Sequence, residues 1–236
     1  GEKMKKINVT VFGDSIAKGL LLKNGRPTYL KTSAVEIVAD HFGLKIDNKS
    51  TFGQTITRFT EKKLVEEYLS SLRKKDRNIV VFCIGGNDSD YDWKAIDAAP
   101  EKLHTCKTPL DKFSKLYLSA IEKLKKKKVK VYICALPVVH VKSFFQNYVC
   151  SLANCENIMK FLENDTSIIA RQQEVFNNRL REIAHETKTT FLDIRTPFLN
   201  VKNLEKVYAD DGLHPNEAGQ KLIAETIINF FENQNN

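Results

Sequence analysis

The chain has 236 residues, of which 42% are hydrophobic and 28% are charged, a balance typical of soluble globular proteins. These proportions exclude disordered and collagen-like chains, and no run approaches the ~20 apolar residues of a membrane-spanning helix. At this length we expect one domain over residues 1–236. The 37 Lys and Arg against 29 Asp and Glu give a net charge of +8, which first raises the question of a nucleic-acid partner.

Apolar runs of strand length alternate along the chain with helical patterns. Five strands are expected, at residues 7–12, 44–46, 79–84, 129–136 and 191–194. Amphipathic helical faces lie between them, at residues 64–72, 113–124 and 176–184. This alternation indicates right-handed crossovers and a parallel sheet covered on both faces.

The second expected strand turns polar at residues 47–49 and therefore belongs at an edge of the sheet. The predicted fold class is α/β, a flavodoxin-like three-layer sandwich with a five-stranded parallel sheet of order 2-1-3-4-5. In such a sheet, the active site lies outside the carboxyl ends of the strands.

Two connections, at residues 88–107 and 138–170, are longer than ordinary loops of an α/β fold. Both follow carboxyl ends of strands, so we expect them to be insertions that rim the site. Their aromatic residues are candidates for contacting substrate, and the alternative is that they fill small satellite cores beneath long loops. The residues proposed to contact substrate are Tyr91, Trp93, Phe144 and Phe145.

Four segments place chemically useful residues at strand ends: Gly13-Asp14-Ser15, Gly53, Gly85-Gly86-Asn87-Asp88 and Asp211-Gly212-Leu213-His214-Pro215. A serine hydroxyl needs a neighbouring base before it becomes a useful nucleophile, and acyl transfer needs donors for the developing oxyanion. His214 can serve as the base for Ser15, and Asp211 is close enough to orient the imidazole. The backbone N–H of Gly53 and the amide of Asn87 can supply donors.

Together and in this order, the four segments resemble those of the SGNH hydrolases, also called GDSL-type esterases and lipases, with Ile where the name has Leu. The resemblance implies that Ser15 is the nucleophile, His214 the general base and Asp211 the triad acid. It also implies an oxyanion hole made by Ser15, Gly53 and Asn87. The implied activity is hydrolysis of carboxylic esters through an acyl-enzyme, with no cofactor and no metal.

Each of these residues also has a plainer interpretation. Ser15 could cap the first helix, and Asp210 is an immediate rival of Asp211 as the acid. Asp14 is expected mainly to hold its loop by hydrogen bonds, and it is kept as a tentative substrate contact. The general α/β-hydrolase fold is rejected, because it separates its acid from its histidine and places its nucleophile after a later, central strand.

The five cysteines form two groups. Cys83 and Cys134 lie inside the central strands and are expected to be buried small hydrophobes. The three in the insertions are expected to be free thiols, with a disulfide or a zinc site including His104 as alternatives. These three are Cys106, Cys150 and Cys155.

The lysine run at residues 123–130 closes a predicted helix and opens the fourth strand, at the edge of the sheet opposite the predicted site. No stacking aromatic residues interleave this run, so it indicates a solvated surface and no nucleic-acid partner. The expected partner is a small-molecule or carbohydrate ester. The compartment is expected to be cytoplasmic if Met4 is near the native start, and extracytoplasmic if a leader was removed.

Short-acyl substrates, such as O-acetyl esters of carbohydrate, fit a cleft edged by Trp93 and Tyr91. The alternative is a lysophospholipase or thioesterase whose longer acyl chains follow a groove of Val138, Val139, Phe144 and Phe145. An O-acyltransferase of the same fold, in which a sugar hydroxyl replaces water, is another alternative. A binding module with an idle triad is less consistent with an intact set of residues.

Overall fold

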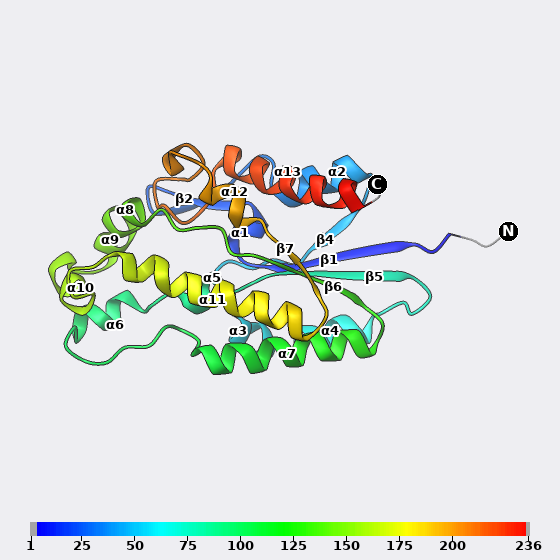
Figure 1. Ribbon diagram of the computed structural model, residues 1–236, viewed down its shortest axis with the longest axis horizontal. Coiled ribbons are helices and arrows are strands. Elements are labelled where there is room, and N and C mark those ends of the chain that lie inside the picture. Colours follow the sequence, from blue (N-terminus) through cyan, green and yellow to red (C-terminus); the bar gives the residue numbers. More distant parts are fainter. Residues whose placement is uncertain (1–3, 235–236) are drawn as a thin grey trace.

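The computed structural model describes residues 4–234. Five parallel strands form one sheet in the order β4-β1-β5-β6-β7 (Figure 1). In sheet order they are β4 (Ile46–Asn48), β1 (Ile7–Gly13), β5 (Arg77–Cys83), β6 (Lys130–Cys134) and β7 (Thr190–Leu192). This layout is the predicted 2-1-3-4-5 order, with the polar strand β4 at one edge, and it confirms the predicted fold class.

Helices cover both faces of the sheet (Figure 1). On one face lie α2 (Ala34–Phe42) and α13 (Glu217–Gln234), with α12 (Arg195–Leu199) and the short η2 (Leu204–Lys206) beside them. The other face carries α3 (Ile56–Glu61), α4 (Leu64–Ser70), α7 (Leu110–Lys126) and α11 (Ser167–Glu186). The three helical patterns found in the sequence correspond to α4, α7 and α11.

The core beneath α3, α4 and α7 is rich in aromatic side chains. The ring of Phe82 on β5 lies 5.6 Å from the ring of Phe59 and 5.6 Å from that of Tyr117, measured between centroids. All three side chains are almost completely buried. This packing holds β5 firmly, and the residues after its carboxyl end belong to the third motif.

The two long connections fold into short helices at the carboxyl end of the sheet. These are α5 (Gly86–Ser89), α6 (Trp93–Ala98), α8 (Val141–Ser143), η1 (Phe144–Val149), α9 (Cys150–Leu152) and α10 (Cys155–Phe161). They share a small core that includes Trp93, Ile96 and Phe144. Asn157 Nδ2 also donates to Asp97 Oδ1 over 2.8 Å, so the two insertions support each other. The expectation of one domain over residues 1–236 stays a prediction, and residues 1–3 and 235–236 lie outside the described part.

Several local features differ from the sequence-based expectation. After the short α1 (Ser15–Lys18), the chain forms an unpredicted hairpin of β2 (Leu20–Lys23) and β3 (Arg26–Tyr29). Its turn uses Asn24 and Gly25, both with positive φ, and such a turn matches the twist of paired strands. The hairpin strands are short and only Leu20 among their residues is buried, so they lack the buried apolar pattern that marked the central strands. In the sheet, β4 begins later than expected, and β6 and β7 are shorter than their apolar runs.

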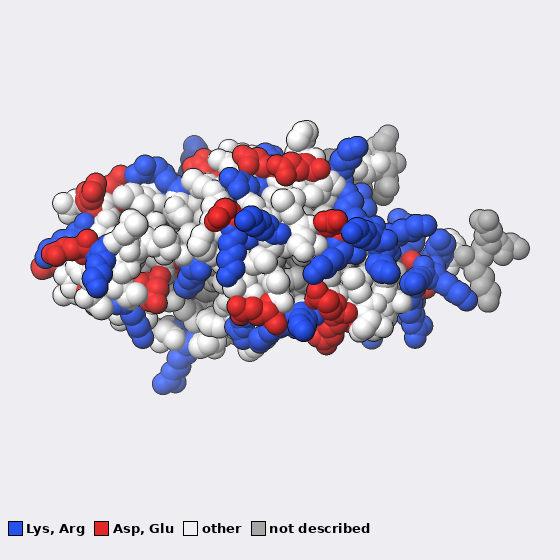
Figure 2. All heavy atoms as spheres, turned by 90° about the horizontal axis from the view of Figure 1, so that it is seen from below, with Lys and Arg blue, Asp and Glu red and all other residues white. Residues whose placement is uncertain are grey.

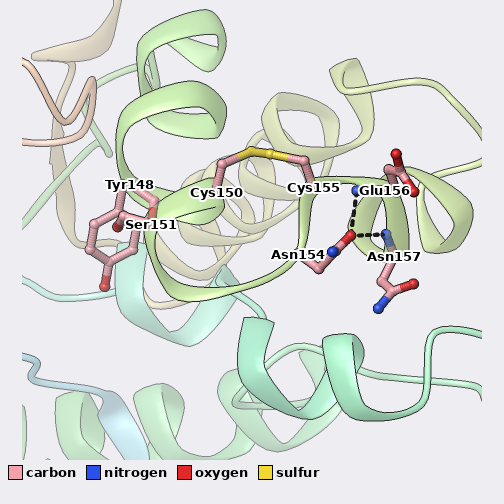
Figure 3. The surroundings of a disulfide bond; sticks show 7 residues. All are labelled: Tyr148, Cys150, Ser151, Asn154, Cys155, Glu156 and Asn157. Atoms are coloured by element: carbon pink, nitrogen blue, oxygen red, sulfur yellow. Dashed lines mark hydrogen bonds between the residues drawn. A yellow bond between two sulfur atoms is a disulfide. The ribbon is translucent and has the colours of Figure 1, made fainter.

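The expectation of free thiols is wrong for two cysteines, because Cys150 and Cys155 form a disulfide (Figure 3). Helix α9 ends at Leu152, and α10 begins at Cys155. Asn154 caps α10 by accepting from the backbone N–H groups of Glu156 and Asn157. This break brings the two cysteine Cα atoms to 5.1 Å, within the usual range for a disulfide. Cys83, Cys106 and Cys134 are free thiols.

His104, considered above as a zinc ligand, lies 2.7 Å from the backbone oxygen of Ala99 through its Nε2 atom. With Cys150 and Cys155 bonded to each other, the proposed ligand set is not assembled. Within residues 4–234, no group of three or more His, Cys, Asp or Glu side chains is arranged to hold a metal ion.

Basic side chains gather at the end of the molecule from which β1 starts, as Figure 2 shows. The lysine run at residues 123–130 spans the end of α7 and the start of β6, at the amino-terminal edge of the sheet. In the part of the chain that the structure describes, no helix has the length and apolar character needed to cross a bilayer.

Candidate active site

Ser15 is the first residue of α1 and follows directly after β1. Asp14 caps this helix by accepting from the backbone N–H of Ile16 over 2.9 Å. The tight turn requires glycine at position 13, since an added Cβ would lie 2.5 Å from the Cβ of Ala17. The turn therefore holds Ser15 at the carboxyl end of β1, at a helix start whose N–H groups have no acceptor within the helix.

The three residues proposed as a triad meet at this position. Ser15 Oγ lies 2.8 Å from His214 Nε2, and His214 Nδ1 lies 2.6 Å from Asp211 Oδ2. All three side chains are buried. An Asp211 carboxylate that accepts from Nδ1–H leaves Nε2 free to accept the hydroxyl proton of Ser15.

Asp211 is held as a charged acceptor. Its second oxygen, Oδ1, accepts the backbone N–H groups of Leu213 and His214, each over 2.9 Å. Burial raises the pKa of this carboxyl, but the hydrogen bond and charge of His214 and the two backbone donors outweigh burial, so the pKa lies below its ordinary value. The rival acid Asp210 is exposed, so Asp211 is the carboxylate that orients the imidazole.

Asn87 on α5 donates one amide hydrogen to the backbone oxygen of Gln54 over 3.0 Å. The second hydrogen of that amide remains for another acceptor. Asn87, Ser15 and His214 line one cavity, whereas Gly53 does not border it. Gly53 has φ of +72°, in a turn closed by a bond from the N–H of Gln54 to the oxygen of Thr51. The link between Asn87 and Gln54 thus sets the amide beside the loop that carries Gly53.

Asp88 was not singled out by sequence reasoning, although it ends the third motif. Its buried carboxylate accepts from the backbone N–H of Ile56 and, over 2.6 Å, from the hydroxyl of Thr108. Burial raises the pKa of Asp88 to about 7 against these hydrogen bonds. Asp88 ties the segment after Gly53 to the segment that carries Asn87.

Asp14 lines the cavity at Ser15, and its carboxyl is also the cap of α1. Burial raises the pKa of Asp14 to about 6, against the bond from Ile16 and the charge of His214. The expected loop-holding role of this side chain is therefore visible in its contacts.

The aromatic residues proposed as substrate contacts lie mainly in a small core of the insertions, which was the alternative to a substrate cleft. Trp93 is 3% exposed, and its Nε1 donates to Asp90 Oδ1 over 3.1 Å. Phe144 is 1% exposed, and Phe145 is half-buried against the same core. The expected cleft edged by Trp93 must be corrected, because this indole faces protein. Tyr91 and Phe144 do border a small cavity of about 20 Å³, together with Asn87.

The second insertion packs directly on the loop that carries Asp211 and His214. The backbone N–H of His140 donates to the oxygen of Gly212 over 2.8 Å. Gly212 has φ of +66°, and a Cβ there would lie 2.4 Å from the oxygen of His140. Only glycine satisfies both conditions, so this residue sets how closely the insertion approaches the site.

Comparisons with known proteins agree with this geometry. The model of the GDSL-like Lipase/Acylhydrolase family matches residues 11–222. The chain belongs to this family. No curated protein sequence matches it. As a GDSL-like acylhydrolase, the protein is a carboxylic ester hydrolase, and the four motifs lie within the matched residues.

Solved structures share the fold. One is a catalytic mutant of an acetylxylan esterase from Geobacillus stearothermophilus, with a TM-score of 0.65, 18% identity, and coverage of 96% of this chain and 94% of that one. Another is a member of the lipolytic G-D-S-L family from Veillonella parvula, with a TM-score of 0.64 and 17% identity, covering 96% of this chain and 98% of that one. At these identities the likeness is one of fold.

Proposed function

We propose that this protein hydrolyses carboxylic esters through an acyl-enzyme on Ser15, with His214 as general base and Asp211 as the acid that orients it. The single observation that carries the proposal is the buried chain of contacts from Ser15 Oγ to His214 Nε2 and from His214 Nδ1 to Asp211 Oδ2. These contacts supply the activated nucleophile that ester cleavage requires.

In the first step, His214 takes the hydroxyl proton while Ser15 Oγ attacks the ester carbonyl carbon. The oxyanion that forms is held by the backbone N–H groups of Ser15 and Gly53 and by the free amide hydrogen of Asn87. Collapse breaks the ester bond, and the leaving alcohol receives the proton from His214. A water activated by His214 then releases the acid and restores Ser15.

The acyl group is the finer part of the proposal. The expectation of short, O-acetyl substrates depended on Trp93 edging an open cleft, and its burial removes that support. The acetylxylan esterase in the comparison shares the fold with this chain at 18% identity, which carries no substrate assignment. The feature that bears on the acyl group is the cavity that adjoins Ser15.

The reaction class is tested by hydrolysis of p-nitrophenyl esters, from acetate to palmitate, by the wild type and by Ser15→Ala. The expected result is loss of at least a thousandfold in kcat for every ester that the wild type cleaves. Ser70→Ala, at an exposed serine of α4, is the matched control and should retain full activity. Unchanged hydrolysis by Ser15→Ala would refute the proposed nucleophile.

A further inference from the structure

A cavity of about 580 Å³ lies between the sheet and the helical pair α2 and α13. At one end it is bordered by Ser15, Asn87 and His214, and at the other by Ile7 and Arg77, near the start of the strands. It therefore continues from the catalytic serine beneath the helical layer (the upper layer in Figure 1), away from the insertions.

The walls of this cavity are mostly apolar and come from two layers. The sheet contributes alternate residues of its strands, which by the period of a strand share one face. The helices contribute residues one turn apart. Representative wall residues are Val9, Val11, Val81, Val38, Ile223 and Ile227.

The two faces of β5 differ in how tightly they are packed. On the face toward α7, Val80 and Phe82 are 0% exposed. On the opposite face, Ile79, Val81 and Cys83 are only half-buried and line the cavity. Protein interiors are normally packed to the density of organic crystals, and an unfilled space costs its lining side chains their contacts. This open space therefore lies on the face of β5 that is continuous with Ser15.

The dimensions match an extended hydrocarbon chain. The cavity runs beside β1 from Ile7 toward Ser15, and the six residue steps of this strand, from Ile7 to Gly13, correspond to roughly 20 Å. Its volume lies within the range of about 300–1,000 Å³ that is usual for small-molecule sites. A short acetyl group would leave nearly all of this apolar space unfilled.

We propose that this cavity, lined by β1, β5, α2 and α13, binds the acyl chain of the substrate, so that the protein is a hydrolase of medium- and long-chain fatty acyl esters. The proposal rests on the proposed function, because the carbonyl carbon is placed at Ser15 Oγ and the chain extends from there beneath α2 and α13. The acyl-enzyme would keep the chain in the cavity until water releases the fatty acid. Each methylene that leaves water for such walls favours binding by roughly fourfold.

The site differs from the groove of Val138, Val139, Phe144 and Phe145 considered from the sequence. Val138 is buried in the core beside α13 and Phe144 in the small core of the insertions, and neither lines the cavity. A long acyl chain is therefore placed in the cavity beneath α2 and α13, on the other side of Ser15 from the aromatic insertions.

The first experiment measures kcat/KM for p-nitrophenyl acetate, octanoate and palmitate. The wild type should prefer octanoate and palmitate to acetate by at least tenfold. Val81→Phe places a ring in the cavity from the sheet side and should lower the ratio of octanoate to acetate at least tenfold. Val175→Phe makes the same change at a 45% exposed position of α11, away from the cavity, and should leave the ratio unchanged. Should Val81→Phe fail to fold, Ile227→Phe narrows the cavity from α13.

The second experiment measures binding of dodecanoic acid by calorimetry in Ser15→Ala, with and without Val81→Phe. Micromolar binding that weakens at least tenfold with Val81→Phe supports the acyl-chain site even if no ester is hydrolysed, in which case only the proposed function fails. Ester hydrolysis that requires Ser15 but prefers acetate, together with no binding of dodecanoic acid, overturns the acyl-chain site and leaves the proposed function intact. An octanoate-to-acetate ratio unaffected by both Val81→Phe and Ile227→Phe would also overturn it.

Discussion

The carboxylate of Asp88 accepts the backbone N–H of Ile56, with its two oxygens 3.0 and 3.1 Å from the nitrogen. Ile56 begins α3, three residues after Gly53, and Asp88 follows Asn87. One buried contact therefore fixes the spacing between two of the proposed oxyanion donors. Asp88 therefore acts as a positioning residue.

The buried Asp88 carboxyl makes stability depend on pH. Its pKa is raised from 3.8 to about 7 in the folded state, so between these values the folded protein binds a proton that the unfolded chain has released. The free energy of unfolding should then fall as pH rises from about 4 to 7, by at most ~1.4 kcal/mol per pH unit from this group. Asp14, raised to about 6, acts in the same direction.

The measurement is urea unfolding of the wild type and Asp88→Asn at several pH values. In Asp88→Asn, the free energy of unfolding should fall less steeply between pH 4 and 7 than in the wild type. The part of the slope that comes from Asp14 should remain. Asp47→Asn, at an exposed position of β4, should keep the wild-type slope. Identical slopes for the wild type and Asp88→Asn would contradict a raised pKa at this site.

Asp211→Asn should lower kcat by roughly 10³–10⁴ while leaving KM nearly unchanged. The amide can keep its Oδ1 acceptor for the N–H groups of Leu213 and His214, but its NH₂ group then faces Nδ1 and selects the wrong tautomer of His214. Steady-state kinetics and a melting curve separate this effect from unfolding. The neighbouring change Asp210→Asn should cost less than twofold, and an equal loss in both variants would argue against Asp211.

Asn87→Ala should lower kcat by about 10²–10³ for every ester tested, because one oxyanion donor is lost. The bond to the Gln54 oxygen is lost as well, and the expected cost to stability is about 1 kcal/mol. Kinetics of Asn87→Ala are compared with those of Asn229→Ala, at an exposed position of α13. A rise in KM with kcat unchanged would mean that Asn87 binds substrate without further stabilising the transition state.

Gly212→Ala tests the contact between the second insertion and the catalytic loop. A Cβ at position 212 would meet the His140 oxygen at 2.4 Å with φ of +66°, so we expect a loss of about 3 kcal/mol in stability and a lower kcat. Gly25→Ala is the matched control, since φ is +73° there but nothing lies within 4 Å. Its loss should be about 1 kcal/mol, with kcat unchanged. Chemical denaturation measures the loss of stability in both variants, and steady-state kinetics measures kcat. Equal losses of stability in Gly212→Ala and Gly25→Ala would contradict the close approach of His140 to Gly212.

The strands of the central sheet and the motif segments could be predicted from the sequence, because each is marked by a short stretch of neighbouring residues. Continuous apolar runs mark strands covered by helices on both faces, as β5 and β6 are, and strands that alternate with helices leave few topologies. The proximity of Ser15 to His214, 199 positions apart, followed from the rule that carboxyl ends of parallel strands share one edge.

Features that depend on local packing detail were either missed or kept only as alternatives. The hairpin of β2 and β3 has little buried surface, and the disulfide of Cys150 with Cys155 depends on the helix break between α9 and α10. The insertion aromatics showed no pattern that separates a cleft from a satellite core, and Trp93 proved to be buried. The large cavity was invisible for a similar reason, because an apolar residue such as Val81 has the same sequence pattern whether it faces a void or another side chain.

Fluorophosphonate labelling followed by peptide mapping shows whether Ser15 is the activated nucleophile. We expect one phosphonyl group per chain, attached to Ser15, and at least a hundredfold slower labelling in His214→Ala. Label mapped to another residue, or labelling of Ser15→Ala at the wild-type rate, would contradict this role of Ser15.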